Sequence, residues 1–582
     1  MCGILGFITK NSYKKIISEK DGIQALNYLQ NRGPDSLNSE YIEMGKYNLF
    51  LGHTRLAIQD LSSEYNQPYK SKMRQNLLVY NGEIYNYRDF IDYKNYTSDT
   101  KALYELLSNK KSDLNKFDGI FSFVFWNKNQ NCLYFARDRF GVKPLFILIK
   151  NDFIAFSSSI RAIEKLCEKF IKLNLNFDYL NQSIEMGYSH DDSTIFKEIN
   201  KLKKNTFLKL DLDSWNFSNN KIYSEKLFCL ESKGHISQNS LALNIKEAIK
   251  SQTITSNRGF GFFLSGGTDS SLLVAEALKL NSKSKINTFS LIVTGKDTNE
   301  LKNIKAFKKF FKDFKNIRFR KSNFVKSKII NALTGYKNLD YPVLDLSIIP
   351  SIVLCDSVDK DIRVILSGDG ADELFCGYPR VYSTFWRFMI INLIPKKLKS
   401  IIIFLFPKNT KLKKYLLANH PLDIRMMLMD IDYNNYEFDF SFKKDFKSIF
   451  KTICDYELNY YLPSVLEKVD AASMLSSLEV RVPFLSNKVI DYLSKISILD
   501  FIWQKNTKLF LKKILSLSTS NSYAFLPKKG FSFNRKNQVR AVTSFLESKN
   551  YPLILGDKEE ILIKKSEKKY IRLLLLKHWL FN

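Results

Sequence analysis

The second half of this 582-residue sequence predicts an α/β domain built on a doubly wound parallel sheet. Three continuous apolar runs, at residues 260–264, 286–293 and 362–367, have the length of buried strands. Helical stretches separate them, and strands that alternate with helices form parallel sheets that bind ligands beyond the strand carboxyl ends. The chain is long enough to hold more than one domain.

The strand at 260–264 ends in a loop that is suited to bind phosphate. The sequence Ser265-Gly266-Gly267-Thr268-Asp269-Ser270 follows it and leads into an amphipathic helix at 269–280. Glycines allow a close approach of the backbone to an anion, and a helix N-terminus offers free N–H groups. No Gly-x-x-x-x-Gly-Lys-Ser/Thr pattern of the Walker type occurs. Alone, the loop would be an ordinary glycine-rich turn, and the other motifs favour phosphate binding.

The composition limits the classes of partner. The formal net charge is +30, which is compatible with binding nucleic acid or an anionic membrane surface. The lysines are spread through most of the chain, however, and the densest cluster, at 305–321, has phenylalanines at helical spacing. We therefore expect no nucleic-acid partner.

Cysteine and hydropathy patterns predict a cytoplasmic protein without zinc. The seven cysteines are scattered, odd in number and form no Cys-x-x-Cys pair. The N-terminus shows no signal-peptide pattern. The most apolar segment, 385–406, is interrupted by Pro395 and three lysines, so it predicts two packed helices rather than a membrane span. We expect no membrane partner.

The N-terminus presents a candidate nucleophile, Cys2, at the start of a predicted strand. Methionine before a small residue is normally removed, and Cys2 would then carry a free α-amine. With a reference pKa near 7.7–8.0, this amine can accept the thiol proton near neutral pH. For a lone cysteine, burial at a strand start would be the commoner explanation.

Four motifs downstream favour the catalytic role for Cys2. They are Arg32-Gly33-Pro34-Asp35, Gly52-His53-Thr54-Arg55-Leu56, Tyr80-Asn81-Gly82-Glu83-Ile84-Tyr85-Asn86 and Ser98-Asp99-Thr100. Together with Cys2 they resemble the class II glutamine amidotransferase domain. The resemblance implies a sandwich of antiparallel sheets covered by helices, over residues 1–213.

Glutamine chemistry explains this set of residues. Arg55 would bind the α-carboxylate of glutamine, and Glu83 or Asp99 its α-ammonium. Asn81 and the Gly82 N–H would stabilise the oxyanion formed at the amide carbonyl. Alone, Asn81-Gly82 would predict only a hairpin turn.

The second half, 214–582, resembles an ATP pyrophosphatase of the glutamine-dependent asparagine synthetase family. The resemblance rests on the loop at 265–270, on Gly368-Asp369-Gly370-Ala371-Asp372-Glu373, and on two segments at 468–474 and 478–485. It implies that ATP is bound by Leu264, Ser265, Gly266, Gly267, Asp269, Ser270, Leu291, Ser367 and Gly368.

Two carboxylates of this half predict a magnesium site, because Asp269 and Asp372 each follow a strand end at the same edge of the sheet. Asp369, where many relatives have Glu, is assigned by the resemblance to formation of the acyl-adenylate. Lys528 matches the family lysine that neutralises the transferring phosphate, and Lys529 is the alternative if the register slips. The segment at 211–227 predicts a linker, and the tail at 571–581 a helix that closes the core.

The sequence thus predicts ATP-dependent amidation of a carboxylate with ammonia from glutamine, with Mg²⁺ as cofactor and AMP and pyrophosphate as products. Aspartate is the favoured acceptor, and a sugar acid of surface-polysaccharide synthesis is the alternative. A third hypothesis, a basic nucleic-acid-binding protein on an inactive enzyme fold, is disfavoured by the intact Cys2, Asp269, Asp372 and Lys528. A homodimer is compatible with the sequence.

Overall fold

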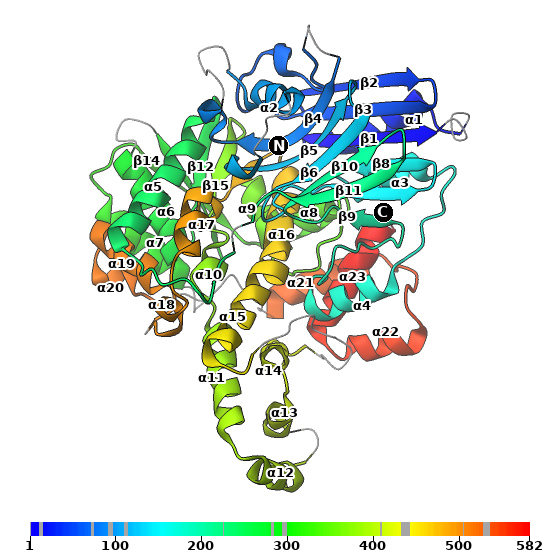
Figure 1. Cartoon of the computed structure of the whole chain (residues 1–582). Coiled ribbons are helices and arrows are strands. Elements are labelled where there is room, and N and C mark those ends of the chain that lie inside the picture. Colours follow the sequence, from blue (N-terminus) through cyan, green and yellow to red (C-terminus); the bar gives the residue numbers. More distant parts are fainter. Residues whose placement is uncertain are drawn as a thin grey trace.

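The computed structural model describes residues 2–10, 16–71, 75–90, 97–109, 114–224, 226–280, 285–293, 299–407, 410–431, 443–504, 506–527 and 536–581. Figure 1 shows two bodies packed side by side, with the N-terminal strands above and a helix-rich second half below and beside them. Three helices of the second half, α11 to α13, extend away from both bodies.

The N-terminal half is a sandwich of two antiparallel sheets, as predicted. The six-stranded sheet has the order β2 (Ser36–Met44), β3 (Tyr47–Arg55), β1 (Gly3–Lys10), β8 (Phe153–Ser157), β7 (Phe146–Lys150) and β9 (Ile199–Lys201). The five-stranded sheet has the order β11 (Asn216–Lys221), β10 (Thr206–Asp211), β6 (Cys132–Arg137), β5 (Gly119–Asn127) and β4 (Leu77–Ile84).

Alternation along the strands places one set of apolar side chains between the sheets and another under helices. Ile4 and Ile8 of β1 meet Val79 of β4 and Val124 of β5 in the core between the sheets. Phe7 faces the other way, in a cluster with helices α1 (Glu19–Leu26) and α3 (Ile160–Cys167). Helix α2 (Asp99–Ser108) covers the outer face of the five-stranded sheet.

The polar stretch predicted as a linker, 211–227, is instead partly strand. Residues Asn216–Lys221 form β11, which pairs with β10 along its whole length. All six residues are exposed, because β11 is an edge strand, and an exposed edge strand needs no apolar alternation. The prediction of a linker was wrong because β11 lacks the apolar alternation of a half-buried strand. The division of the chain at residue 213 remains a prediction.

The second half contains an all-parallel sheet, which confirms the predicted class. Its order is β14 (Ile317–Asn323), β13 (Ile286–Ile292), β12 (Gly259–Phe263), β15 (Ile362–Leu366) and β16 (Glu479–Arg481). From β12 the chain adds β13 and then β14 on one side of the sheet. It then returns to add β15 and β16 on the other side of β12. The loops after β12 and β15 therefore diverge to opposite faces, and such a switch point forms a crevice.

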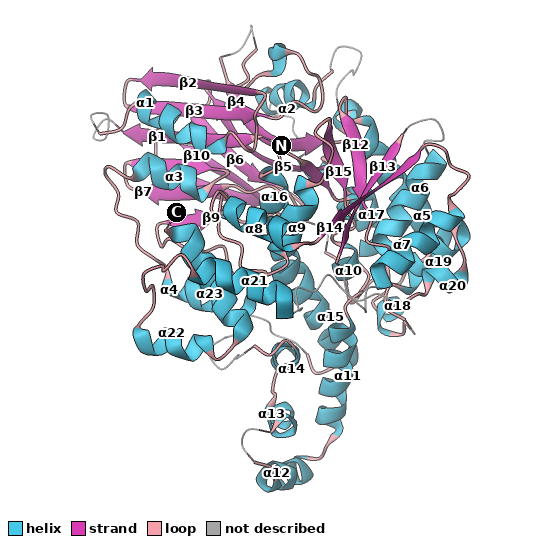
Figure 2. Ribbon diagram, turned by 180° about the vertical axis from the view of Figure 1, so that it is seen from behind, coloured by secondary structure: helices cyan, strands magenta, loops and turns pink. Residues whose placement is uncertain are grey.

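Helices cover both faces of the parallel sheet (Figure 2). On one face lie α5 (Gln238–Ile254), α6 (Thr268–Leu280) and α7 (Asn299–Phe310), which bury Phe262 and Val364. On the other lie α9 (Ile348–Asp356) and α16 (Leu462–Met474), against Phe289 and Ile365. The C-terminal helix α23 (Glu567–Leu580) buries Ile571 and Trp579, as predicted for the tail.

The apolar segment 385–406 forms two helices that are interrupted at Pro395, as predicted. They are α11 (Pro379–Leu393) and α12 (Lys396–Leu405). The expected packing of both is only partial for α12, which has no fully buried residue and packs Ile402 and Ile403, half-buried, against the core. Nothing in the composition of 396–405 distinguishes an exposed apolar helix from a packed one. Among the described residues, no helix is long and apolar enough to cross a membrane.

Candidate active sites

Cys2 lies at the first residue before β1, buried between the two sheets and the second half of the chain. Its backbone nitrogen donates to Asn81 Oδ1 at 3.0 Å, and its carbonyl oxygen accepts from Arg32 Nε at 3.1 Å. These two hydrogen bonds hold the Cys2 backbone on both sides of its side chain. Burial raises the pKa of the Cys2 thiol, although the amino terminus, the Leu56 N–H and Arg55 act against this. A protonated thiol needs a nearby base before it can attack a carbonyl.

Asn81 and Gly82 are on β4, directly beside Cys2. While Asn81 Oδ1 accepts from Cys2, Asn81 Nδ2 is buried and has no hydrogen-bond partner within the described part of the chain. A buried donor without a partner costs free energy, and an oxyanion there would satisfy it. Gly82 has a φ of +152°, and a Cβ on it would lie 2.1 Å from the Ile120 carbonyl oxygen. Glycine is therefore required at this position.

The predicted glutamine-recognition residues surround the same site. Arg55 is held by the loop after β3, where Nη1 donates to Ser62 O at 2.6 Å and Nη2 to Asp60 O at 2.5 Å. Asp99 Oδ2 accepts from the Tyr80 hydroxyl at 2.8 Å and from the Ile84 nitrogen at 3.0 Å. Burial raises the pKa of Asp99 to about 6, so it is mostly ionised at neutral pH.

Glu83 has a partner that the sequence does not predict. It accepts from Gln59 Nε2, and its Oε1 lies 3.4 Å from Arg481 Nη2 of the second half. Arg481 is completely buried and also donates from Nε to Glu479 at 2.6 Å. The Glu83 carboxylate is therefore tied to the parallel-sheet domain.

Arg32 makes a second link between the halves. Its Nη1 lies 2.7 Å from Asp340 Oδ2 and 3.0 Å from Asp470 Oδ2, while its Nε contacts the Cys2 carbonyl. Arg32 is 1% exposed. The backbone at Cys2 is thus anchored on two acidic residues that are more than 300 positions away in the sequence.

The loop 265–270 connects β12 to α6 at the switch point of the sheet. Ser270 Oγ accepts from the Ser265 nitrogen at 3.2 Å and lies 3.1 Å from Ser265 Oγ, which closes the loop. Gly266 has a φ of +72°, a conformation that glycine adopts without strain. Ser265, Asp269 and Ser270, at and just before the start of α6, line the adjacent pocket, and a helix start offers free N–H groups to an anion.

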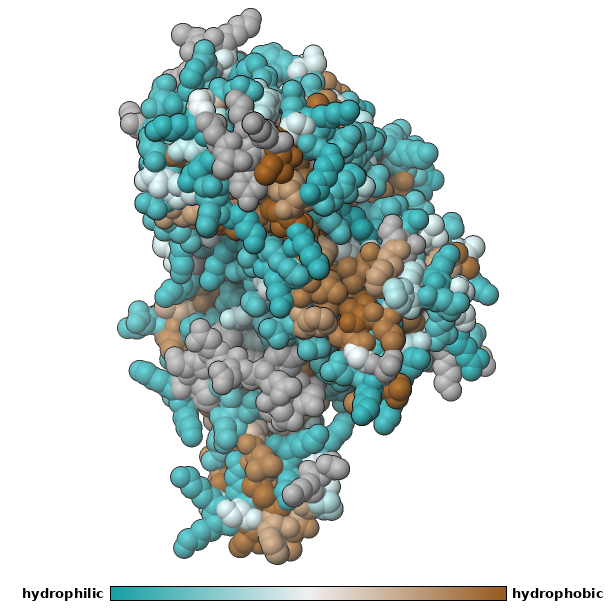
Figure 3. Space-filling model, turned by 90° about the vertical axis from the view of Figure 1, so that its right-hand side faces the viewer, coloured by the Kyte–Doolittle hydropathy of each residue, from teal (hydrophilic) through white to brown (hydrophobic). Residues whose placement is uncertain are grey.

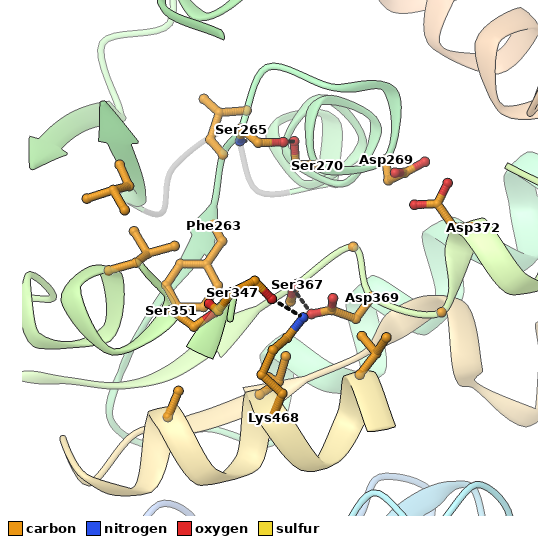
Figure 4. Close-up of a pocket in the computed structure, with 18 of the residues that line it drawn as sticks. Phe263, Ser265, Asp269, Ser270, Ser347, Ser351, Ser367, Asp369, Asp372 and Lys468 are labelled. Carbon is orange, nitrogen blue, oxygen red and sulfur yellow. Dashed lines mark hydrogen bonds between the residues drawn. The ribbon is translucent and has the colours of Figure 1, made fainter. Parts of the chain in front are cut away.

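A pocket opens where this loop meets the loop after β15 (Figure 4). A Cβ on Gly368 would lie 2.9 Å from Asp269 Cβ, so the two loops are in contact. Most of the predicted ATP-binding residues line the pocket, namely Leu264, Ser265, Asp269, Ser270, Leu291, Ser367 and Gly368. Gly266 and Gly267 complete the loop without lining the pocket. The local motifs therefore predicted the position of the crevice.

The two carboxylates predicted as metal ligands do come together. Lys508 Nζ lies 2.5 Å from Asp269 Oδ2 and 2.6 Å from Asp372 Oδ1. Asp269 Oδ1 is buried without a hydrogen-bond partner in the described residues. Burial opposes the charge of Lys508, but the two carboxylates outweigh it and raise the pKa of the lysine.

This arrangement fits a divalent cation. Two carboxylates and the oxygens of a bound triphosphate are the hard ligands that Mg²⁺ prefers. The described residues hold no group of three or more His, Cys, Asp or Glu side chains arranged for a metal. A metal here would therefore need phosphate oxygens to complete its coordination. Lys508 was missed by the sequence reasoning, because no motif marks it.

Asp369 and Lys468 line the same pocket, and Figure 4 shows Lys468 opposite Ser265 and Ser270, with Asp369 between them. Ser367 Oγ donates to Asp369 Oδ2 at 2.5 Å. Lys468 Nζ donates to Ser347 Oγ at 2.9 Å and lies 3.4 Å from Asp345 Oδ2. Burial opposes the charge of Lys468, yet Asp345 and Asp369 raise its pKa, so the ammonium is charged at neutral pH. This end of the pocket carries both a cation and an anion.

Lys528 and Lys529 lie outside the described residues, so their roles stay predictions. The described chain just before them approaches the phosphate loop. The Tyr523 hydroxyl lies 2.8 Å from Ser271 Oγ and 3.5 Å from the Gly266 carbonyl oxygen. Tyr523 therefore lies beside the loop 265–270.

The fold and the two sites together define a glutamine amidotransferase joined to an ATP-using synthetase. Residues 1–222 match the family model of the glutamine amidotransferase domain, and residues 240–550 match that of asparagine synthase. The chain therefore belongs to the glutamine-hydrolysing asparagine synthetase family.

Curated relatives cover most of the chain. A putative asparagine synthetase of Methanocaldococcus jannaschii is 30% identical over 431 residues, which are 69% of this chain and 80% of the relative. Asparagine synthetase 1 of Bacillus subtilis is 27% identical over 563 residues, or 88% of this chain and 84% of the relative. Both are described as glutamine-hydrolysing.

Proposed function

We propose that the chain converts aspartate to asparagine, using ammonia from glutamine and cleaving ATP to AMP and pyrophosphate. The observation that carries the choice of acceptor is the pair Lys468 and Asp369 at one end of the pocket. An amino acid such as aspartate presents one carboxylate and one ammonium to such a pair. A sugar acid has no ammonium to pair with the Asp369 carboxylate, which accepts one hydrogen bond from Ser367 Oγ. The relatives are also named as asparagine synthetases.

The glutaminase step would take place at Cys2 once its α-amine is free. The amine accepts the thiol proton, and the sulfur attacks the side-chain amide carbon of glutamine. Asn81 Nδ2 and the Gly82 N–H donate to the resulting oxyanion. The amide nitrogen takes the proton back from the α-ammonium and leaves as ammonia, and water then hydrolyses the thioester to glutamate.

The recognition of glutamine follows from the charges around Cys2. Arg55 binds the α-carboxylate, with its guanidinium oriented by the carbonyls of Asp60 and Ser62. Asp99 and Glu83 receive the α-ammonium. Glu83 is partly neutralised by Arg481, so Asp99 is the main partner.

The synthetase step would use the pocket at the switch point. The side-chain carboxylate of the acceptor attacks the α-phosphorus of ATP, and pyrophosphate leaves along the loop 265–270. Ammonia then attacks the acyl carbon and loses a proton, and AMP leaves. Asp369 and Lys468 orient the acceptor, and Lys528 neutralises charge on the transferring phosphate.

Asp269 and Asp372 would hold Mg²⁺ on the pyrophosphate oxygens. When bound, the ion supplies positive charge that stabilises the leaving group. Lys508, which neutralises the two carboxylates in this structure, would then turn to the phosphates. A cytoplasmic location and a homodimer stay predictions from the sequence.

The acceptor assignment is tested by the kinetics of Lys468→Met. If Lys468 binds the α-carboxylate, the variant raises the KM for aspartate by roughly 10- to 100-fold, as expected for a charge-assisted bond of about 1.5–3 kcal/mol. The KM for ATP stays within about twofold. A variant whose aspartate KM is unchanged would contradict this assignment.

A further inference from the structure

A helical arm projects from the second half of the molecule, and neither catalytic site explains it. The arm consists of α11, α12 and α13 (Lys411–Leu417). Figure 1 shows that α11 leads away from both bodies and that α12 lies across its far end. Helices α14 (Pro421–Leu428) and α15 (Phe446–Tyr456) pack against α11 and hold the arm in place.

The far end of the arm exposes large apolar side chains. Phe404 is 88% exposed, Leu393 78% and Leu405 69%. More exposed apolar side chains of the arm join them, namely Ile390, Leu398, Ile401, Phe406, Leu412 and Leu417. Figure 3 shows brown surface gathered at the tip of the arm, beside teal side chains. Soluble proteins rarely expose so many large apolar residues in one place unless the patch binds something.

The charge of the arm has a single sign. Between Glu373 and Asp423 the sequence contains nine lysines and arginines and no aspartate or glutamate. Three of the lysines, Lys396, Lys397 and Lys399, occupy the first turn of α12, ahead of its exposed apolar residues. Among the cations that the structure describes, Arg380 pairs with Glu457 and Lys411 lies 3.8 Å from Asp430.

An anionic lipid surface matches both properties. Helices that lie in a membrane interface place apolar side chains at the acyl boundary and lysines among the headgroups. Lysines near an anionic leaflet each strengthen the attraction. A second copy of the arm matches poorly, because two surfaces that carry only positive charge repel each other. The sequence alone favoured no membrane partner, because Pro395 and three lysines interrupt the apolar segment 385–406, which predicted two packed helices.

We propose that the arm docks this protein on an anionic phospholipid surface, with the apolar end of α12 inserted at the interface. Helix α11 begins next to Tyr378, which lines the ATP pocket. Its 15 residues span about 22 Å, so docking would hold the pocket near the membrane without burying it. The inference does not depend on the reaction that the pocket catalyses.

Sedimentation of the full-length protein with vesicles tests the proposal. Vesicles of phosphatidylcholine alone are compared with vesicles that also contain phosphatidylglycerol, at low and at physiological salt. One variant, Ile401→Asp/Phe404→Asp/Leu405→Asp, removes the apolar end, and Lys396→Gln/Lys397→Gln/Lys399→Gln removes the charge. All six side chains are on α12, which has no buried residue, so both variants should fold.

Two control variants carry changes of the same kind on other helices. Ile561→Asp/Leu562→Asp alters two exposed residues of α22 (Asp557–Lys564), and Lys305→Gln/Lys308→Gln/Lys309→Gln alters exposed lysines of α7. Thermal melting and activity without vesicles check that each variant is intact.

The expected result is binding to phosphatidylglycerol vesicles only. The lysine variant should bind roughly a hundredfold more weakly, from about fivefold per lysine, and the aspartate variant should not sediment. The α22 and α7 controls should bind as the wild type does. Equal binding by the wild type and both α12 variants would overturn the proposal. A wild-type protein that ignores vesicles but dimerises through α12, as light scattering would show, would overturn it too.

Discussion

Lys508 Nζ lies 2.5 Å from Asp269 Oδ2, in the crevice where the loops after β12 and β15 meet. The same ammonium lies 2.6 Å from Asp372, so one cation contacts both carboxylates. The proposed Mg²⁺ would be held by the same two carboxylates.

Replacing either carboxylate should remove ATP turnover and spare glutamine hydrolysis. Asp269→Asn or Asp372→Asn leaves one ligand for the metal, whereas the Cys2 site lies in the other domain. Pyrophosphate release and glutamate formation are measured in parallel, with Asp356→Asn, an exposed position of α9, as control. Wild-type pyrophosphate release by either variant at limiting Mg²⁺ would show that the proposed ligands are wrong.

If Cys2 is the nucleophile, replacing it should remove glutamine hydrolysis and spare the synthetase reaction. Cys2→Ala should abolish glutamine hydrolysis, while amidation with added ammonia continues, because the synthetase pocket is unchanged. Cys229→Ala, a partly exposed cysteine between the two domains, is the matched control. If purified Cys2→Ala still released glutamate from glutamine, another residue would have to be the nucleophile.

Arg481 should be one of the most sensitive positions for stability. It is fully buried between Glu83 of one domain and Glu479 of the other. Arg481→Met leaves two buried carboxylates without their cation, which costs about 3–5 kcal/mol. Urea unfolding of the variant measures this cost against Arg318→Met, an exposed arginine of β14. A loss below about 0.5 kcal/mol would mean that the ion pair does not hold the domains together.

Glu373 predicts a pH dependence of stability. Burial and the nearby Asp372 raise the pKa of Glu373 to about 8, from an ordinary value of 4.5. The folded state therefore holds a proton that the unfolded state releases between these values. The stabilisation is full below about pH 4.5 and is lost as the pH rises through about 8.

Glu373→Gln cannot ionise and should lose no stability in this way. The melting temperature of the wild type should fall relative to that of the variant from about pH 5 to about pH 8, and level off above. Glu231→Gln, at an exposed position, should melt in parallel with the wild type throughout. A constant difference between wild type and Glu373→Gln over this range would show that Glu373 does not titrate there.

The local sequence motifs predicted much of the candidate site. The contacts between residues that are far apart in the sequence could not be predicted. The loop 265–270 and Asp372 follow apolar strands, so their meeting at one sheet edge follows from the rules of parallel sheets. Lys508 is 239 residues from Asp269, within no recognisable motif. Nothing in the sequence therefore indicates that it enters the crevice.

The sequence patterns also failed to predict two parts of the fold. Strand β11 is exposed along its length and lacks the alternation that marks a half-buried strand. Helix α12 has the apolar residues of a core helix, but none of them is fully buried and only Ile402 and Ile403 are half-buried against the core. Hydropathy alone does not tell whether an apolar helix faces a core or a partner.

The most direct test of the account is to follow the complete reaction. Purified wild type is given glutamine, ATP, Mg²⁺ and aspartate, and asparagine, AMP, pyrophosphate and glutamate are quantified together. If the proposed reaction is correct, asparagine, AMP and pyrophosphate appear in equal amounts. Asparagine formation then disappears when aspartate is omitted. Formation of ADP in place of AMP, or ATP cleavage that aspartate does not stimulate, would contradict it.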